Sequence, residues 1–311
     1  MTGAAMTGIQ DRAAMEALAR QVEAHPDFRV VRRFDPARAG APLTGSAVRR
    51  GVVVDTETTG TDLEADQVIE LALVAFEYDE ASGAIGRVLG SYSALEDPGR
   101  DIPPASTAIH HITDEMVAGQ RIDDAAVASL LDGVSIVVAH NAGFDRRFLE
   151  RRLSVFESLP WACSFYEVPW AEHDLSSAKL EYLAYRAGFF YEGHRAEIDC
   201  RALLEVLRQP LGKTGASAFK TLLARSAEPT CRLWATKSPF ETKDVLRARG
   251  FRWDPNARCW WKELPKSQLF AETVWLKAAV YGGTPAIVDV DYLDAKVRFS
   301  ERDGDRKKVK L

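Results

Sequence analysis

The sequence predicts an α/β protein in which a mixed sheet is flanked by helices, with a small α+β module toward the C-terminus. Apolar runs bounded by polar residues predict long strands, at 51–56, 67–78, 85–95 and 134–139. Helical spacing of apolar residues occurs between and after these runs, near 122–132, 144–156, 177–187 and 196–208. Strand hairpins followed by alternating helices and strands are typical of a mixed sheet with helical layers.

Five segments are expected along the chain. They are an N-terminal helix and strand extension over 1–48, the α/β domain over 49–210, a linker over 211–228, a basic Trp-rich α+β module over 229–285, and a C-terminal strand with a basic tail over 286–311. Within the extension, the apolar spacing predicts a helix over 9–24 and a strand over 27–34. In the module, the pattern Ser238 to Glu241 predicts a capping box that opens a helix.

Composition narrows the class of protein. The 311 residues carry a net charge of −5 and are 46% hydrophobic, which supports a substantial core and argues against a histone-like role. The four cysteines contain no Cys-x-x-Cys pair, so neither a zinc site nor a disulfide framework is expected. No signal-peptide pattern and no apolar stretch of membrane-spanning length are found. We therefore expect a cytoplasmic protein with no membrane partner.

Acidic residues gather where the predicted strands and helices end. Asp55 and Glu57 close the apolar run that begins at Gly51, and residues two apart on a strand share one face. Asp145 follows the strand over 134–139, and Asp199 lies early in a predicted helix. Four carboxylates in one cleft require bound cations, and an oxygen-only ligand set favours Mg²⁺ or Mn²⁺ over Zn²⁺. Two such ions, about 3.5 to 4 Å apart, would suit in-line displacement at a phosphodiester.

A general base is also expected beside these carboxylates. His194 precedes Asp199 by five residues, on the loop that enters the helix. An imidazole titrates near pH ~6.5, which suits proton removal from an attacking water. Glu70 lies inside an otherwise apolar run, where a carboxylate is usually paired or at an edge.

Three motifs together resemble those of one enzyme family. They read Asp-Thr-Glu-Thr-Thr-Gly from Asp55, His-Asn-Ala-Gly-Phe-Asp from His140, and His-Arg-Ala-Glu-Ile-Asp from His194. In this order and spacing they resemble the DEDDh family of 3′-to-5′ exonucleases, over about residues 50 to 208. The resemblance implies a five-stranded RNase H-like fold, two bound Mg²⁺ or Mn²⁺ ions held by the four acidic residues, and His194 as the catalytic base. Within the family, the core resembles the proofreading exonuclease of bacterial replicative polymerases.

The resemblance also implies substrate contacts. The residues concerned are Thr58, Thr59, Leu63, His110, Asn141 and Phe144. His111 departs from the family's loop, which often has Gly there, so a different loop path is expected if that Gly is needed for a positive φ. Leu63 is expected to supply the apolar wedge, because Thr61 and Asp62 follow the first motif.

The implied reaction is removal of nucleoside 5′-monophosphates from a 3′ end, on single-stranded DNA in replication or repair. RNA is the alternative substrate, because recognition of the 2′-OH is not visible in the sequence. A second alternative is a non-catalytic nucleic-acid-binding or polymerase-binding protein, which would be expected to lack part of the acidic set. Gln268 to Phe270 faintly resembles a sliding-clamp peptide, although packing inside the predicted helix is the simpler interpretation.

The C-terminal module mixes basic and aromatic residues. Residues 229–266 hold nine Lys or Arg, four Asp or Glu, and four of the seven tryptophans. Such a mixture suits stacking on a single strand. The alternatives are that the tryptophans form the core of a small module, or that they dock a partner. Trp260 and Trp261 are expected to face opposite sides of a hairpin, so one can be core while the other is exposed.

Overall fold

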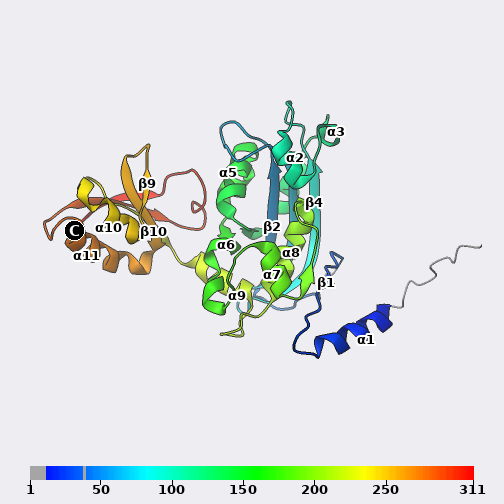
Figure 1. Ribbon diagram of the computed structural model, residues 1–311. Coiled ribbons are helices and arrows are strands. Elements are labelled where there is room, and N and C mark those ends of the chain that lie inside the picture. The colour runs from blue at the N-terminus through cyan, green and yellow to red at the C-terminus, as the bar shows by residue number, and fades with distance from the viewer. Residues whose placement is uncertain (1–11, 38–39) are drawn as a thin grey trace, which may run out of the picture.

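The computed structural model describes residues 12–37 and 40–311, and two sheets organise them (Figure 1). The first sheet has the strand order β4-β3-β2-β5-β6. Its strands are β2 (Val48–Thr58), β3 (Val68–Asp79), β4 (Ile85–Leu95), β5 (Val134–Ala139) and β6 (Trp161–Cys163). β2, β3 and β4 form an antiparallel meander, whereas β5 runs parallel to β2 and β6 runs parallel to β5. This mixed five-stranded arrangement is the RNase H-like fold, as predicted.

Helices cover both faces of this sheet because its central strands are apolar on both sides. The helices of the α/β body are α2 (Pro104–His110), α3 (Asp114–Val117), α4 (Asp124–Leu131), α5 (Ala142–Arg152), α6 (Ser164–Glu167), α7 (Leu180–Arg186), α8 (Ala196–Arg208) and α9 (Ala218–Ala227). Alternate residues of β2 divide between two cores: Val53 packs with α7, α8 and α9, and Val52 packs with α4 and α5. Short helical turns η1 (Ser154–Ser158) and η2 (Trp170–His173) connect these elements.

The N-terminal extension stands largely apart from the body. Helix α1 (Arg12–Glu23) has no buried residue, and β1 (Arg32–Arg33) pairs with β7 (Phe189–Phe190). The sequence predicts a strand over 27–34, but only Arg32 and Arg33 pair with another strand. The part of the helix predicted over residues 9–11 lies outside the described residues. Among the described residues, no helix is both long and apolar enough to cross a membrane.

The segment 211–228 is not the linker that the sequence predicts. Helix α9 occupies most of it, and Ala218, Phe219 and Leu222 are buried in the core beneath α8. Phe219 packs edge-on against Phe76 of β3. The helix therefore completes the α/β body, because it covers apolar surface that the sheet would otherwise expose.

The C-terminal module is an antiparallel sheet with helices on one face. The order is β12-β11-β8-β10-β9. The elements are β8 (Thr230–Trp234), η3 (Phe240–Thr242), α10 (Lys243–Ala248), β9 (Arg252–Asp254), β10 (Cys259–Pro265), η4 (Lys266–Gln268), α11 (Leu269–Ala279), β11 (Ile287–Leu293) and β12 (Asp305–Lys310). Residues 305–310 of the expected basic tail form the edge strand β12, because their backbone pairs with β11. The predicted capping box is absent, since Pro239 precedes η3 and no side chain caps it.

The loop between β11 and β12 fastens the module to the α/β body. The Arg146 side chain on α5 is fully buried and donates hydrogen bonds to the carbonyls of Ala295, Lys296 and Arg298. Arg298, also buried, pairs with Glu167 at the end of α6. Phe299 packs against the core beneath α5. We call this loop, residues 294–304, the docking loop.

Candidate active site

Three carboxylates converge where β2 meets α8. Asp55 and Glu57 lie near the end of β2, on one face as their spacing predicts, and Asp199 lies in the first turn of α8. One oxygen from each lies within 4.8 Å of the others, and all three side chains are partly exposed. They line a pocket of about 340 Å³. The donor set is all oxygen, which is the set that hard divalent cations prefer.

Asp145 lies beside this cluster but is more deeply placed. It is 2% exposed, on the first turn of α5. One of its oxygens accepts hydrogen bonds from the backbone N–H and the hydroxyl of Thr56, at 3.1 and 2.9 Å. Thr56 lies between Asp55 and Glu57 in sequence, so the hydrogen bonds tie Asp145 to the strand that carries them. The structure therefore places the fourth carboxylate next to the other three, not in the pocket lining.

Electrostatics make the cluster unfavourable without cations. Burial raises the pKa of Glu57 to about 8, and repulsion from Asp199, Glu70 and Asp145 adds to the shift. Burial likewise raises the pKa of Asp145 to about 7. The pKa of Asp55 is raised well above its usual range by burial and then by the charge of Asp145, and burial raises the pKa of Asp199. A bound cation would relieve this repulsion and return all four groups to their charged forms.

His194 faces the same pocket from the loop before α8. It lines the pocket with the three carboxylates and adopts a left-handed backbone with φ 67°. The next residue, Arg195, donates its backbone N–H to Asp199 and its guanidinium to Glu70. Glu70 is 2% exposed and also accepts the N–H of Ala196. The buried Glu70 is thus paired, and it fixes the start of the helix that carries Asp199.

The expected substrate-contact residues occupy different surroundings. The Thr58 hydroxyl donates to the carbonyl of Gly60, and the buried Thr59 hydroxyl donates to Asp66, so both hydroxyls are engaged within their own loop. Leu63 is partly buried against the core beneath α5. Asn141 lines the carboxylate pocket, whereas Phe144 lines the wider groove beside it.

The loop after α2 keeps a left-handed turn without glycine. His111 adopts φ 60° and ψ 17° as the C-cap of α2. An altered loop path was expected only if this residue could not adopt a positive φ. His111 does adopt one, so that condition is not met. His110 is buried, its Nδ1 accepts the N–H of Ile112, and burial lowers its pKa.

Several residues in the pocket or beside it were not expected from the sequence. Tyr191 donates its hydroxyl to Asp199 at 3.0 Å. His140 also lines the pocket, and its Nδ1 lies 2.8 Å from the Ser164 hydroxyl. Tyr166 and Lys179 complete one side of the pocket. Tyr191 and Lys179 lie outside the three motifs, so only the folded chain brings them there. His140 opens the second motif, but nothing in that motif distinguishes a role for it.

Fold and site together define a metal-dependent nuclease, and comparison with known proteins gives the family. The exonuclease family RNase_T matches residues 52–207, which is half of the chain and spans all three motifs. The chain belongs to this family, which depends on divalent metal, and it is a DEDDh-type 3′-5′ exonuclease.

Individual relatives each match about half of the chain. The DNA polymerase III subunit epsilon of Treponema pallidum is 32% identical over 161 residues, which are 49% of this chain and 72% of that protein. A PolC-type DNA polymerase III of Clostridium perfringens is 32% identical over 169 residues, but these are 50% of this chain and only 11% of the polymerase. Exonuclease X in complex with 5′ overhanging duplex DNA is 26% identical, with 55% of this chain and 97% of that chain covered and a TM-score of 0.42.

Proposed function

We propose that this protein removes nucleoside 5′-monophosphates one at a time from the 3′ end of single-stranded DNA. The observation that carries the proposal is the convergence of Asp55, Glu57 and Asp199 within 4.8 Å, in a pocket that His194 also lines. Carboxylates that hold cations are poor bases for removing a proton from the attacking water. The imidazole of His194 in the same pocket can accept that proton at neutral pH.

The residues present fit two divalent cations. Asp55, Glu57 and Asp199 would hold them from the pocket, and Asp145 would add the oxygen that Thr56 leaves free. When bound, Mg²⁺ or Mn²⁺ would stabilise the charge that develops on the attacking and leaving oxygens of the phosphodiester. Tyr191 and Arg195 hold Asp199 in place through their hydrogen bonds.

His194 takes the proton from the attacking water in this mechanism. Its left-handed backbone turns the side chain into the pocket from the loop before α8. Arg195, the next residue, fixes that loop through two hydrogen bonds: its backbone N–H donates to Asp199 on α8, and its guanidinium donates to Glu70 on β3. The proposed substrate contacts are the residues that the family resemblance implies. They are Thr58, Thr59, His110, Asn141 and Phe144, with Leu63 as the wedge beside the terminal base.

Single-stranded DNA is favoured because relatives that match about half of the chain are a subunit and a PolC-type form of DNA polymerase III. On that basis we infer a role in DNA replication or repair, with a polymerase as a candidate partner. RNA is the alternative substrate. We also propose that the α/β domain extends through α9, to about residue 228, and that the module spans 229–311, since the core contacts of α9 and the pairing of β12 favour these limits.

Matched oligonucleotides test this proposal. DNA and RNA 12-mers of one sequence, labelled at the 5′ end, are incubated with Mg²⁺, Mn²⁺ or EDTA and resolved on a sequencing gel. We expect a ladder that shortens from the 3′ end with Mg²⁺ or Mn²⁺, faster on DNA, and no cleavage in EDTA. An equal rate in EDTA would overturn the metal mechanism, and faster cleavage of RNA would overturn the choice of substrate.

A further inference from the structure

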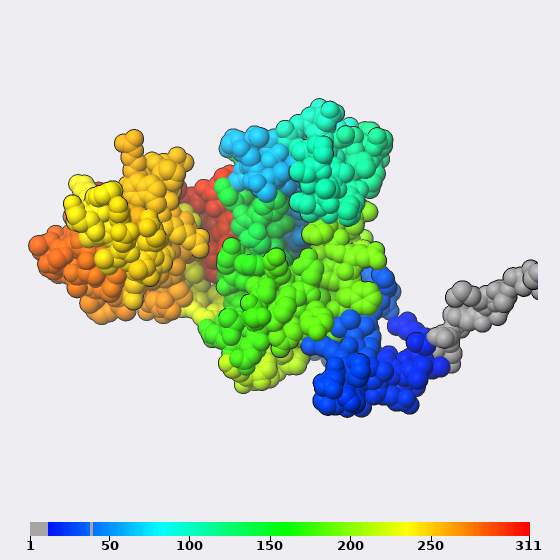
Figure 2. All heavy atoms as spheres, in the orientation of Figure 1, coloured from blue at the N-terminus to red at the C-terminus, as the bar shows by residue number. Residues whose placement is uncertain are grey.

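A groove of about 1210 Å³ separates the C-terminal module from the α/β body, and Figure 2 shows the surface hollowed between the two. Phe144, Arg147 and Tyr166 line it from the α/β body, and the docking loop lines it with residues 298–301. Asn141 and Tyr166 line both this groove and the carboxylate pocket. The groove is therefore continuous with the candidate active site.

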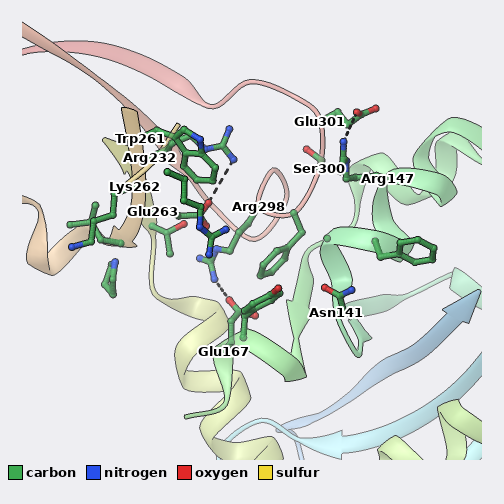
Figure 3. A pocket seen from close by; sticks show the side chains of 18 of the residues that line it. Asn141, Arg147, Glu167, Arg232, Trp261, Lys262, Glu263, Arg298, Ser300 and Glu301 are labelled. Carbon is green, nitrogen blue, oxygen red and sulfur yellow. Dashed lines mark hydrogen bonds and ion pairs between the residues drawn. The ribbon is translucent and has the colours of Figure 1, made fainter. Parts of the chain in front are cut away.

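The wall opposite α5 is the face of the module sheet that carries no helix. Trp261 on β10 is paired with Arg252 on β9 and Trp234 on β8, and directly paired residues point to one face. Its neighbour Trp260 points the other way and packs against the module core. Figure 3 shows Trp261 and Arg232 side by side where the sheet faces the groove. The module thus uses one tryptophan of the pair for its core and presents the other in the groove.

Trp261 is a half-buried ring held between cations. The guanidinium carbons of Arg232 and Arg252 lie 4.9 and 5.7 Å from its ring centre. On the opposite side of the groove, Tyr166 is 62% exposed and packs edge-on against Phe165. Both rings keep part of their surface exposed, and such rings suit stacking with unpaired bases.

The charge of the groove favours a single strand over a duplex. Three arginines are already paired with carboxylates: Arg147 with Glu301, Arg232 with Glu263, and Arg298 with Glu167. Lys262 also lines the groove, but it pairs with Glu272 of α11. The remaining acidic lining residues are Glu172, Glu228 and Asp254. A duplex binder needs a broad basic surface, and this groove does not provide one.

Two cations in the groove have no carboxylate partner among the residues that the structure describes. They are Arg225 at the end of α9 and Arg252 on β9, and both are exposed. They line the same groove as Trp261 and Tyr166. This combination of partly exposed aromatic rings with two guanidiniums that pair with no carboxylate of the described residues matches alternating bases and phosphates.

We propose that this groove binds the unpaired strand upstream of the 3′ end that is being cleaved. Trp261 and Tyr166 stack on bases, and Arg225 and Arg252 contact phosphates. The proposal rests on the proposed function for the direction of the strand, because the groove opens into the carboxylate pocket beside Asn141. The docking loop holds the two walls at a fixed separation through the buried Arg146 and Arg298.

Binding in metal-free buffer tests the groove independently of cleavage. The full-length chain in EDTA is titrated into fluorescent dT 20-mer, dT 4-mer, U 20-mer and a 20-base-pair duplex, and anisotropy is followed. Trp261→Ala is expected to weaken binding of the 20-mer about 5- to 150-fold, the equivalent of about 1 to 3 kcal/mol per stacked base, with little change for the 4-mer. Arg225→Gln with Arg252→Gln should lower the salt slope for the 20-mer by about 1.4, at about 0.7 per phosphate contact.

The matched control removes two cations from the helix-covered side of the module. Arg247→Gln with Lys243→Gln changes the net charge equally, and neither residue lines the groove. This control should leave the salt slope within about 0.3 of the wild-type value, because the slope counts phosphate contacts. If it lowers the slope as much as the groove pair, the change in slope reflects net charge and not the groove, and the proposal fails.

Trp261→Phe keeps a stacking ring and is the second variant if Trp261→Ala unfolds. It should retain most of the affinity for the 20-mer.

The outcomes separate the two proposals. If wild type cleaves no substrate yet the groove variants lose affinity for the 20-mer, the proposed function fails and the groove stands. If cleavage of the 4-mer is normal but every groove variant binds the 20-mer as tightly as wild type, the groove proposal fails alone. If the groove variants lose equal affinity for the DNA and RNA 20-mers, the groove binds a single strand through its backbone and bases and does not distinguish DNA from RNA. If wild type binds the duplex more tightly than the single strand, the choice of ligand is refuted.

Discussion

Replacing Glu57 with Gln should stabilise the metal-free protein at neutral pH. Burial and the surrounding carboxylates raise the pKa of Glu57 from 4.5 to about 8, so the folded state binds this proton more tightly than the unfolded state. When folding raises the pKa of a carboxyl group, the free energy of unfolding falls as the pH rises from the pKa of the unfolded state to the pKa of the folded state. The loss therefore begins near pH 4.5 and is complete near pH 8.

The magnitude follows from the size of the shift. At pH 7.5, a pKa difference of this size corresponds to at most about 4 kcal/mol, at about 1.4 kcal/mol per pKa unit. Partial exposure of the side chain lowers this to about 2 kcal/mol. For a body of this size, such a change raises Tm by about 4 to 8 °C.

Thermal unfolding in EDTA at pH 7.5 and at pH 5.0 measures the effect. Glu57→Gln should melt above wild type at pH 7.5 and close to it at pH 5.0, and added Mg²⁺ should raise the Tm of wild type more than that of the variant. Glu181→Gln, an exposed carboxylate of the same pocket, is the control and should shift neither curve. A Glu57→Gln variant that melts at or below wild type at pH 7.5 would show that the cluster is not strained without cations.

Three further predictions concern catalysis and the docking loop. Asp145→Ala or Asp199→Ala should abolish cleavage while raising Tm in EDTA, because one repelling carboxylate is removed; a variant that still cleaves at the wild-type rate with Mg²⁺ contradicts the assignment. His194→Ala should lower kcat by roughly 10²- to 10⁴-fold with unchanged binding of DNA, and a rate within about twofold of wild type would remove this residue from the mechanism. Arg298→Met should cost about 3 to 5 kcal/mol in urea unfolding, because it leaves the buried carboxylate of Glu167 unpaired. Adding Glu167→Gln should recover part of that loss, and no recovery would mean that the pair does not account for it.

The sequence predicts the sheet well because strand periodicity is local. The ranges 85–95, 134–139 and 196–208 agree with β4, β5 and α8 at both ends. Helix α9 was not predicted, since the stretch before it is rich in Gly, Ser and Thr, which favour loops. The sequence predicts a basic tail where β12 lies, because the basic residues conceal the strand alternation, and the strand forms by pairing with β11.

The candidate site was predictable where it lies within motifs and not where it depends on tertiary contacts. Asp55, Glu57 and Asp199 converge as expected. The deeper position of Asp145 depends on its hydrogen bonds to Thr56, a residue 89 positions away. The hydrogen bond from Tyr191 to Asp199 also depends on the path of the chain between β7 and α8, which no local pattern encodes.

The docking loop sets an order for folding during synthesis. Helix α5 carries both Asp145 and Arg146, and the carbonyls that accept from the buried Arg146 guanidinium belong to residues 295–298. Until those residues leave the ribosome, the guanidinium lacks its three carbonyl acceptors and has only the ion pair with Glu150 on its own helix, and the apolar surface beneath α5 lacks Phe299. The residues of the catalytic body are translated before the docking loop, yet the loop completes their packing. A nascent chain that ends before residue 295 would therefore be a poorly packed nuclease, which makes complete assembly of the body depend on synthesis of the docking loop.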